Sequence, residues 1–247
     1  GRPRALVLVA RREDRLRELQ TELTGHRPDL PVSIECCNLA DRVQVAALVE
    51  RLEAAHGGID VLINNAGHGV SGLYDQAPWE AVENMLELNV LTLAYLTRRL
   101  VPGMVARGRG GVLNVSSGYG VTFGPGMAGY IGSKHFVTGF TEGLRVDLSG
   151  TGVTVTQVLP GPVETEFSAA MAKVSHTNQR MRLPKLLTLS ADRCARAALN
   201  AFVRGRARVV PGFFMKLVLA LARFSPLACV RAPMSRKARW YRRQVAP

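Results

Sequence analysis

The segment between residues 112 and 134 constrains the fold of this chain more than any other stretch. It opens with a short apolar run, Val112, Leu113 and Val115, of the kind found in parallel strands that are covered on both faces. Ser117 follows at the carboxyl end of the run, and open α/β sheets bind their ligands at that end. The pattern predicts a doubly wound α/β fold with a mostly parallel sheet and a polar site after this strand.

Tyr130 and Lys134 follow in a predicted helix, four residues apart. Residues at this spacing share one helical face, with about 5–6 Å between their Cβ atoms. A nearby cation favours the ionised phenol, so we expect Lys134 to lower the pKa of Tyr130. Ser117 could then hold a carbonyl oxygen while Tyr130 protonates it, as reduction by an external hydride requires. For the five-residue pattern alone, an ordinary surface pair is the commoner explanation.

Three further motifs stand in order along the chain. Asn64-Asn65-Ala66-Gly67 follows an apolar run, Asn89 lies in the next helical segment, and Pro160-Gly161-Pro162-Val163-Glu164-Thr165 follows a β-branched run. Ser117 and Tyr130 are thirteen residues apart. With these motifs the sequence resembles the short-chain dehydrogenase/reductase family over roughly residues 5–210.

The resemblance implies a single-domain, Rossmann-like, NAD(P)-dependent oxidoreductase and suggests roles for the site residues. Ser117 and Tyr130 would contact the substrate, Tyr130 would donate the proton, and Lys134 would tune the phenol. Asn89 would hold a water against Lys134 and so begin a proton relay from solvent. A purely structural role for Asn89 stays open, because a buried amide needs hydrogen-bond partners in any case.

Arg11 stands where the family reads the adenosine ribose. An arginine suits a 2′-phosphate, whereas an acidic residue accepts from a 2′-hydroxyl, so NADP(H) is expected in preference to NAD(H). The alternative is that Arg11 is a solvated charge at a helix start. Asn38 replaces the family's usual aspartate at the adenine, and its side-chain carbonyl can accept the same hydrogen bond. The implied cofactor contacts are Arg11, Asn38, Leu39, Asn64, Ala66, Gly67, Tyr130, Lys134, Pro160, Gly161, Val163 and Thr165.

The first strand, glycine-rich turn and helix of the family pattern have no counterpart in this sequence. We therefore expect roughly 30–40 further residues upstream, since a strand, turn and helix form a unit of about that size. The first strand would lie in the middle of the sheet, so a chain without it would leave two central edges unpaired. The glycines between 118 and 124 imitate a dinucleotide fingerprint but lead into Gly-Pro-Gly and not into a helix.

Apolar periodicity predicts the remaining elements. Strands are expected at residues 5–10, 32–37, 59–63, 153–158 and 207–210, and helices at 11–25, 41–56 and 79–107. The third of these helices would turn five aliphatic side chains inward, Leu86, Val90, Leu93, Leu96 and Leu100.

Residues 1–212 are interpreted as the reductase domain and residues 213–247 as a C-terminal extension. Residues 166–190 would form a substrate lid that carries Phe167, Met171, Met181 and Leu183. Methionine-bearing lids suit apolar and variable substrates.

The extension joins an apolar piece at 213–222 to a basic end around Trp240 and Tyr241, which holds six of the chain's 32 Lys and Arg residues. Such a tail could meet an anionic membrane surface or a phosphate-bearing acyl carrier. The alternative, slightly favoured, is a helix packed on the lid or on a second subunit. Nucleic-acid binding is the weakest option, because no recognition motif accompanies the charge.

The composition bounds the class of protein. A chain of 247 residues with 47% hydrophobic and 21% charged residues is expected to form one sizeable globular core. It has no apolar run of membrane-spanning length and no signal-peptide pattern, so a cytoplasmic location is the default expectation. Cys36, Cys37, Cys194 and Cys229 lack metal-ligand spacing and are interpreted as reduced thiols, and no metal site is expected.

The sequence therefore predicts an NADPH-dependent reductase of an apolar ketone or aldehyde, such as a 3-oxoacyl or steroid-like compound in lipid metabolism. A homo-oligomer is expected. The alternative is a non-catalytic, nucleotide-sensing or membrane-associated scaffold on the same fold.

Overall fold

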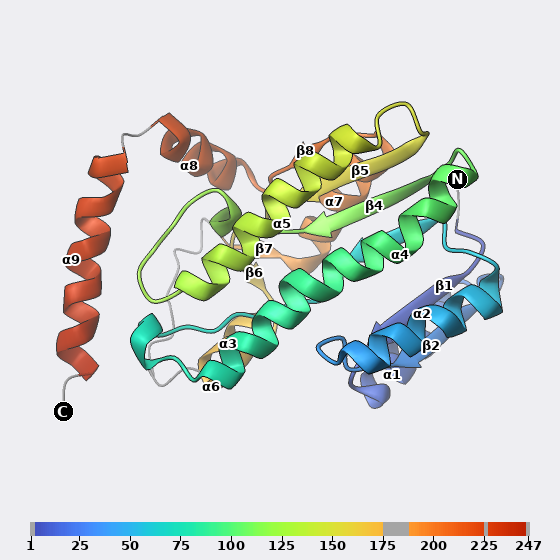
Figure 1. The fold of residues 1–247 in the computed structure, drawn as a ribbon, viewed down its shortest axis with the longest axis horizontal. Helices are drawn as coiled ribbons and strands as arrows, with labels where there is room; N and C mark the ends of the chain where they lie inside the picture. The colour runs from blue at the N-terminus through green and yellow to red at the C-terminus, as the bar shows by residue number, and fades with distance from the viewer. Residues whose placement is uncertain (1–2, 175–187, 225–226, 246–247) are drawn as a thin grey trace. The chain divides into compact units, whose positions relative to one another are not determined.

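The computed structural model describes residues 3–174, 188–224 and 227–245 (Figure 1). The chain divides into two compact units, Gly1–Gly58 and Ile59–Pro247, and each is described by itself.

The first unit is a β-α-β-α arrangement whose two strands run parallel, with Ala10 opposite Cys36 at their carboxyl ends. The side chain of Asp41 accepts from the backbone N–H groups of Val43 and Gln44 and so caps the second helix. The elements are β1 (Leu6–Ala10), α1 (Glu13–His26), β2 (Val32–Cys36) and α2 (Arg42–His56).

The second unit is built on a parallel sheet in the order β3-β4-β5-β8, with a separate short parallel pair, β6-β7. Its strands are β3 (Val61–Asn64), β4 (Gly110–Val115), β5 (Val153–Val158), β6 (Val163–Glu164), β7 (Leu189–Ser190) and β8 (Arg208–Val209).

Helices pack on this sheet and continue beyond it to the C-terminus (Figure 1). They are η1 (Tyr74–Gln76), α3 (Trp79–Leu86), η2 (Glu87–Thr92), α4 (Leu93–Ala106), η3 (Gly118–Gly120), α5 (Ala128–Asp147), α6 (Phe167–Val174), α7 (Ala191–Val203), α8 (Phe213–Phe224) and α9 (Leu227–Val245).

The predicted α/β class with parallel strands is confirmed, and each predicted strand is present within two residues of its expected ends. The prediction of one regular helix at 79–107 is wrong in its middle, because Glu87–Thr92 forms a π-helical segment. A π segment widens the turn and is often found at functional sites, and here it contains Asn89.

Within the described residues, β1 pairs with β2 alone and β3 with β4 alone, so each keeps one edge without a strand partner. No helix of the described ranges is both long and apolar enough to cross a membrane.

The core of the second unit lies around β4, and a polar network ties that strand to its neighbours. The amide of Asn64 at the end of β3 donates to Asn114 Oδ1 on β4 over 2.8 Å, and the amide of Asn114 donates to Thr141 on α5 over 3.0 Å. Buried amides need such partners. The network therefore fixes α5 against the end of β4, where the predicted site begins.

Candidate active site

Tyr130 lies in the first turn of α5 and is 6% exposed. Its ring meets Tyr119 edge to face, with the centroids 6.3 Å apart, and meets Phe167 of α6 at 5.9 Å. The 67–70 segment also packs against the Tyr130 ring, because a Cβ added to Gly69 would lie 3.3 Å from the ring. The phenol is therefore held by apolar groups from three segments.

Ser117 follows β4 and brings its hydroxyl to the phenol. Its Oγ accepts from the backbone N–H of Tyr119 over 3.1 Å, which fixes the side chain, and it lies close enough to the phenol of Tyr130 to lower the pKa of that group. The structure brings Ser117 close to Tyr130, and their joint role at a substrate oxygen stays a prediction. Two hydroxyls thus meet where a carbonyl oxygen could accept from both.

Lys134 lies one turn after Tyr130 and is 5% exposed. Its ammonium donates to the carbonyl of Val115 at the end of β4 over 3.0 Å, and it lies 6.0 Å from the centre of the Tyr130 ring. Burial lowers the pKa of Lys134 to about 8, because the charged form has lost its water without gaining a carboxylate.

The expectation that Lys134 lowers the pKa of Tyr130 is wrong for this structure. Burial raises the pKa of the phenol, and the hydrogen bond with Ser117 offsets only part of that shift. The helical spacing correctly predicted that Lys134 lies beside Tyr130. The ammonium, however, donates to the carbonyl of Val115, and the phenol has lost its contact with water. Tyr130 is consequently protonated at neutral pH, which is the form a proton donor must have.

Asn89 projects from the π segment and is 1% exposed. Its amide donates to the carbonyl of His68 over 2.8 Å and to Ser133 Oγ over 3.1 Å, and its Oδ1 accepts from the N–H of His68 over 3.1 Å. These bonds hold the 67–69 segment against α5, as the structural alternative for Asn89 requires. The relay role stays a prediction.

Gly67 lies between Asn89 and Lys134. A Cβ at this position would lie 2.9 Å from Asn89 Oδ1 and 3.4 Å from Lys134 Nζ, so a larger residue would displace the Asn89 amide and lie in contact with the ammonium. Ala66 is exposed beside it. The backbone at 66–67 is therefore open on one side and closely packed on the other.

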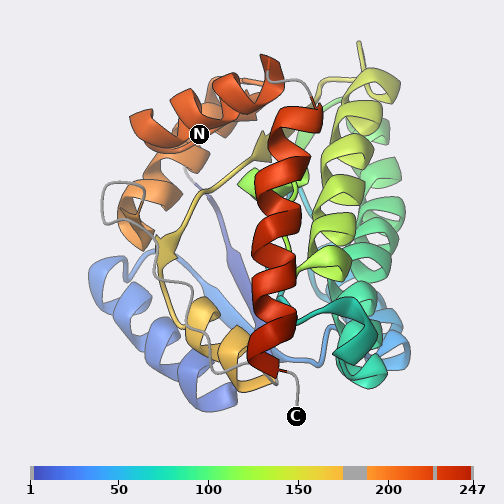
Figure 2. The ribbon, with the colours of Figure 1, turned by 90° about the vertical axis from the view of Figure 1, so that its left-hand side faces the viewer.

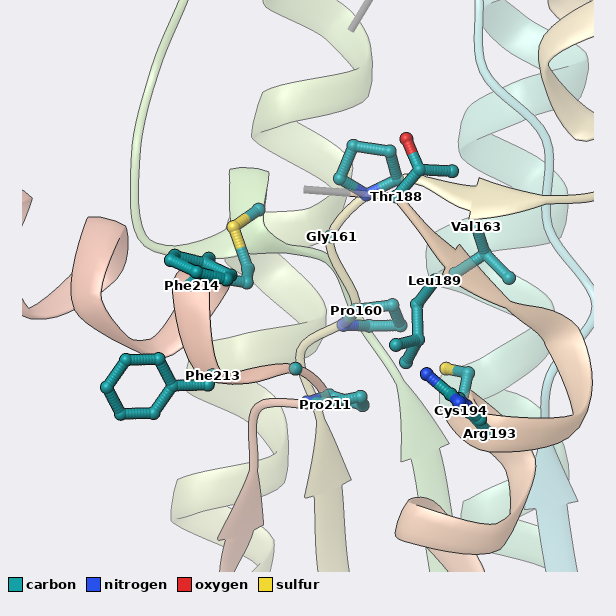
Figure 3. A pocket seen from close by; sticks show the side chains of 13 residues that line it. Pro160, Gly161, Val163, Thr188, Leu189, Arg193, Cys194, Pro211, Phe213 and Phe214 are labelled. Atoms are coloured by element: carbon teal, nitrogen blue, oxygen red, sulfur yellow. The ribbon is translucent and has the colours of Figure 1, made fainter. Parts of the chain in front are cut away.

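The turn after β5 borders a cavity of about 350 Å³ (Figure 3). Predicted cofactor contacts Pro160, Gly161 and Val163 line it, whereas Thr165 accepts from the N–H of Phe167 at the start of α6. The other lining residues are Pro162, Thr188, Leu189, Arg193, Cys194, Pro211, Gly212, Phe213, Phe214 and Met215.

Ser117, Tyr130 and Lys134 are not among the residues that line this cavity. The two places are nevertheless joined, because the N–H of Gly118 donates to the carbonyl of Pro160 over 2.7 Å. The predicted residues of the second unit thus form two adjoining groups.

The remaining predicted contacts, Arg11, Asn38 and Leu39, belong to the first unit, after the carboxyl ends of β1 and β2. Arg11 is exposed, and its carbonyl accepts from Cys36 Sγ over 3.4 Å. Asn38 Oδ1, the atom expected to meet adenine, accepts from the N–H of Ala40 over 3.2 Å. A carbonyl oxygen has a second lone pair, so the expected role stays open to it.

Sequence reasoning missed the contacts that Tyr119, Asp75 and Arg242 make. Tyr119 carries no motif, and only the structure places its ring on Tyr130. Asp75 of η1 forms a bidentate ion pair with Arg242 of α9, 167 positions away. In the predicted lid, α6 brings Phe167 to the phenol, and Met181 and Leu183 lie outside the described residues.

Comparisons with known proteins agree with this arrangement. The sequence model of a family described as "short chain dehydrogenase" matches residues 3–175. An "Uncharacterized oxidoreductase" of Myxococcus xanthus is 40% identical over 141 residues, which cover 56% of this chain and 55% of that protein. The "NADP-dependent 3-hydroxy acid dehydrogenase YdfG" of Escherichia coli K12 is 36% identical over 166 residues, covering 66% of this chain and 64% of that protein.

Among solved structures, a "Short-chain dehydrogenase from Sphingobium yanoikuyae in complex with NADPH" is similar with a TM-score of 0.76 and 29% identity. The similarity covers 91% of this chain and 87% of that one. By sequence, the matched region spans only between 55% and 65% of the length of the first curated relatives.

The lowered pKa of Lys134 predicts a pH-dependent stability. Between about pH 8 and the unfolded value of 10.5, the unfolded chain binds a proton at Lys134 that the folded chain does not, so the free energy of unfolding rises with pH in this window. Lys134→Met removes the effect. The free energy of unfolding of Lys134→Met minus that of the wild type, measured by urea unfolding, should fall by about 2 kcal/mol from about pH 7 to 10. A difference that does not change with pH would contradict the lowered pKa.

Proposed function

The chain belongs to the short-chain dehydrogenase family, and we propose that it reduces a ketone or an aldehyde to an alcohol with a nicotinamide cofactor. The observation that carries this proposal is the meeting of Ser117, Tyr130 and Lys134 at the end of β4. Ser117 holds the carbonyl oxygen, and the protonated phenol of Tyr130 donates to the same atom. Burial of Tyr130 strengthens its hydrogen bond to that oxygen, because little water competes for the phenol.

The chain's own residues suit such a cofactor. Among the described residues, the ammonium of Lys134 donates to Val115 alone, so two of its three protons are available to a pair of ribose-like hydroxyls. The open backbone at Ala66 and the turn at Pro160 and Gly161 would border the same ligand. A bound nicotinamide supplies the hydride that carbonyl reduction needs.

An apolar substrate is proposed from the groups around the phenol. Phe167 and Met171 of α6, together with Tyr119, pack against the cluster that contains Tyr130. Aromatic rings and a methionine favour apolar ligands of varied shape. A 3-oxoacyl or steroid-like ketone would fit this chemistry and would connect the protein with lipid metabolism.

The phosphorylated cofactor is proposed from Arg11. This exposed guanidinium follows β1, where an arginine suits the 2′-phosphate of NADPH. Two of the similar proteins carry the phosphorylated cofactor in their descriptions, the Sphingobium structure with NADPH and the E. coli protein named NADP-dependent.

A homo-oligomer is proposed from the outer face of α5. Phe136 and Phe140 stack with centroids 5.5 Å apart, and Phe136 is 39% exposed. An exposed aromatic stack of this kind is typical of an interface. Sedimentation velocity of the purified chain tests this proposal, which a purely monomeric species would overturn.

We also propose a cytoplasmic location with peripheral membrane contact through the C-terminal extension. Residues 213–247 contain eight of the 32 Lys and Arg residues and none of the 19 Asp and Glu residues. The outer face of α8 is apolar, with Phe213 74%, Leu221 61% and Phe224 84% exposed. An apolar helix face beside a basic one provides the two signals that stable surface anchoring needs. One of the cations, Arg242, is paired with Asp75, which agrees with packing of that end of α9 on the chain.

The catalytic assignment predicts that loss of the Tyr130 hydroxyl oxygen lowers activity. Tyr130→Phe should lower kcat by at least about 10²–10⁴-fold, because the variant lacks the proton donor while its ring packing is unchanged. Tyr119→Phe is the matched control, since it removes the neighbouring hydroxyl, and it should retain most activity. Near-wild-type turnover by Tyr130→Phe would overturn the assignment. If the wild-type chain bound NADPH but reduced no carbonyl compound, the non-catalytic scaffold would be the better description.

The cofactor assignment predicts a selective loss of affinity. Arg11→Ala should weaken NADPH binding by roughly 1.5–3 kcal/mol, because a charge-assisted pair with the phosphate is lost, and should affect NADH much less. Fluorescence titration with both cofactors measures the two losses. Arg12→Ala, the adjacent substitution, is the control. Equal losses for NADPH and NADH would rule out a phosphate contact at Arg11.

The membrane proposal predicts binding to anionic vesicles that weakens with salt. Substituting Arg236, Arg239 and Arg243 by Gln should weaken binding by about 3 kcal/mol, since each cation near an anionic surface contributes about 1 kcal/mol. Changing Leu217, Leu221 and Phe224 together to Ser should also weaken vesicle binding, because all three side chains are exposed on α8. Changing Val43, Val146 and Val203 to Ser is the control, because these side chains are equally exposed elsewhere. Equal binding to neutral and anionic vesicles at low salt would sink the proposal.

A further inference from the structure

The cavity beside the 160–163 turn has walls that the reaction centre does not use. The first turn of α7 contributes Arg193 and Cys194, and the first turn of α8 contributes Phe213 and Phe214. Figure 2 shows α7 and α8, in orange and red-orange, side by side. In Figure 3 the side chains of Arg193 and Cys194 lie next to each other, with the two phenylalanine rings on the opposite side. The volume of about 350 Å³ is within the range of small-molecule sites.

Backbone pairing holds the walls of this cavity in place. The short strands β6 and β7 set Val163 opposite Leu189, and the N–H of Leu189 donates to the carbonyl of Pro162 over 2.9 Å. On the α8 side, Met215 packs on Gly161, where an added Cβ would lie 2.8 Å from the terminal carbon of the methionine. The cavity is therefore a product of the fold and does not depend on one side-chain rotamer.

The walls of the cavity are mainly apolar. Leu189, Phe214 and Met215 line it together with several prolines. Burial raises the pKa of the Cys194 thiol, so this side chain is neutral at pH 7 and behaves as a small apolar group. A surface of this composition suits a hydrocarbon chain.

Arg193 gives the apolar cavity a cation. Among the described residues no carboxylate pairs with its guanidinium, whereas Arg196, one turn later, pairs with Asp192 over 2.8 Å. Ser190 Oγ accepts from the N–H of Arg193 over 3.4 Å, so α7 begins here and the positive end of its dipole lies on the same side. A guanidinium matches a carboxylate with two parallel hydrogen bonds.

We propose that this cavity binds a small apolar carboxylate, such as a medium-chain fatty acid, whose carboxylate is held by Arg193 and whose chain lies against Leu189 and Phe214. One guanidinium suits a single negative charge, whereas the three acceptor oxygens of a phosphate group call for more donors than these walls provide. The site is separate from Ser117 and Tyr130, which do not line the cavity. Binding here does not depend on the proposed reductase function.

The role of Arg193 is tested with octanoate and octanamide, which differ only in the charge of the head group. Isothermal titration calorimetry should show that the wild-type protein binds octanoate about tenfold more tightly, because a hydrogen bond to a charged group is the stronger one. Arg193→Gln should remove this preference. Arg196→Gln is the matched control on the same helix and should keep it, since Arg196 does not line the cavity. A wild-type protein that binds neither compound, or a preference that survives Arg193→Gln, would overturn the proposal.

The apolar walls are tested by chain length and by filling the cavity. Affinity should rise about threefold to fourfold per methylene group from butanoate to octanoate, as burial of each group predicts. Cys194→Phe should abolish binding of both octanoate and octanamide, with thermal unfolding as the check of the fold. Leu199→Phe, an exposed position on α7 outside the cavity, is the control and should bind both. Affinity that is independent of chain length would contradict a hydrocarbon site.

The location of the bound carboxylate is tested by alkylation of the wild-type protein with iodoacetamide. Octanoate should slow the modification of Cys194, followed by mass spectrometry of its peptide, and should not slow that of Cys229, which is exposed and does not line the cavity. The protection should persist with saturating NADPH. If Cys194 is not protected, octanoate binds elsewhere, and if NADPH displaces octanoate, the cavity is part of the cofactor site. Either result overturns a separate carboxylate site.

Discussion

Burial of the Lys134 ammonium beside Tyr130 is the constraint on which the rest of the site depends. A cation that has lost its water must find polar atoms, and here it finds the carbonyl of Val115 at the end of β4. Ser116, next in the chain, donates to the carbonyl of Lys134 over 2.9 Å, so strand and helix are joined in both directions. Asn114 adds a third tie, to Thr141. Any change that separates α5 from β4 would leave these buried groups without partners.

The parts of this site that were predictable are those that local sequence determines. An apolar run that stops at Ser117, and a helix that carries Tyr130 and Lys134 one turn apart, need only the periods of a strand and a helix. The pairing of Asn64 with a neighbouring strand was also predictable, because carboxyl ends of parallel strands lie at one edge. The order of β1–β5 and of α1–α5 followed from the same patterns.

What the sequence could not provide depends on tertiary surroundings. The spacing of Tyr130 and Lys134 predicts that the two side chains are neighbours. The direction of the pKa shift of Tyr130 is instead determined by burial, to which Tyr119 and Phe167 contribute. The π segment around Asn89 arises where an amide must reach the His68 backbone, and the apolar period is unchanged by it. The short pairing of β6 with β7 joins segments with no strand pattern of their own.

The C-terminal extension completes the site from a part of the chain that the family motifs do not reach. The Met215 side chain of α8 packs directly against the backbone at Gly118, which follows Ser117, and at Gly161 in the turn beyond β5. A Cβ at these positions would lie 3.0 and 2.8 Å from its terminal carbon. The end of α9 is joined to the loop that contains η1 by the ion pair of Arg242 with Asp75. The same extension presents exposed apolar side chains on α8 and exposed cations on α9, so one segment provides inner contacts to the second unit and an outer surface of mixed character.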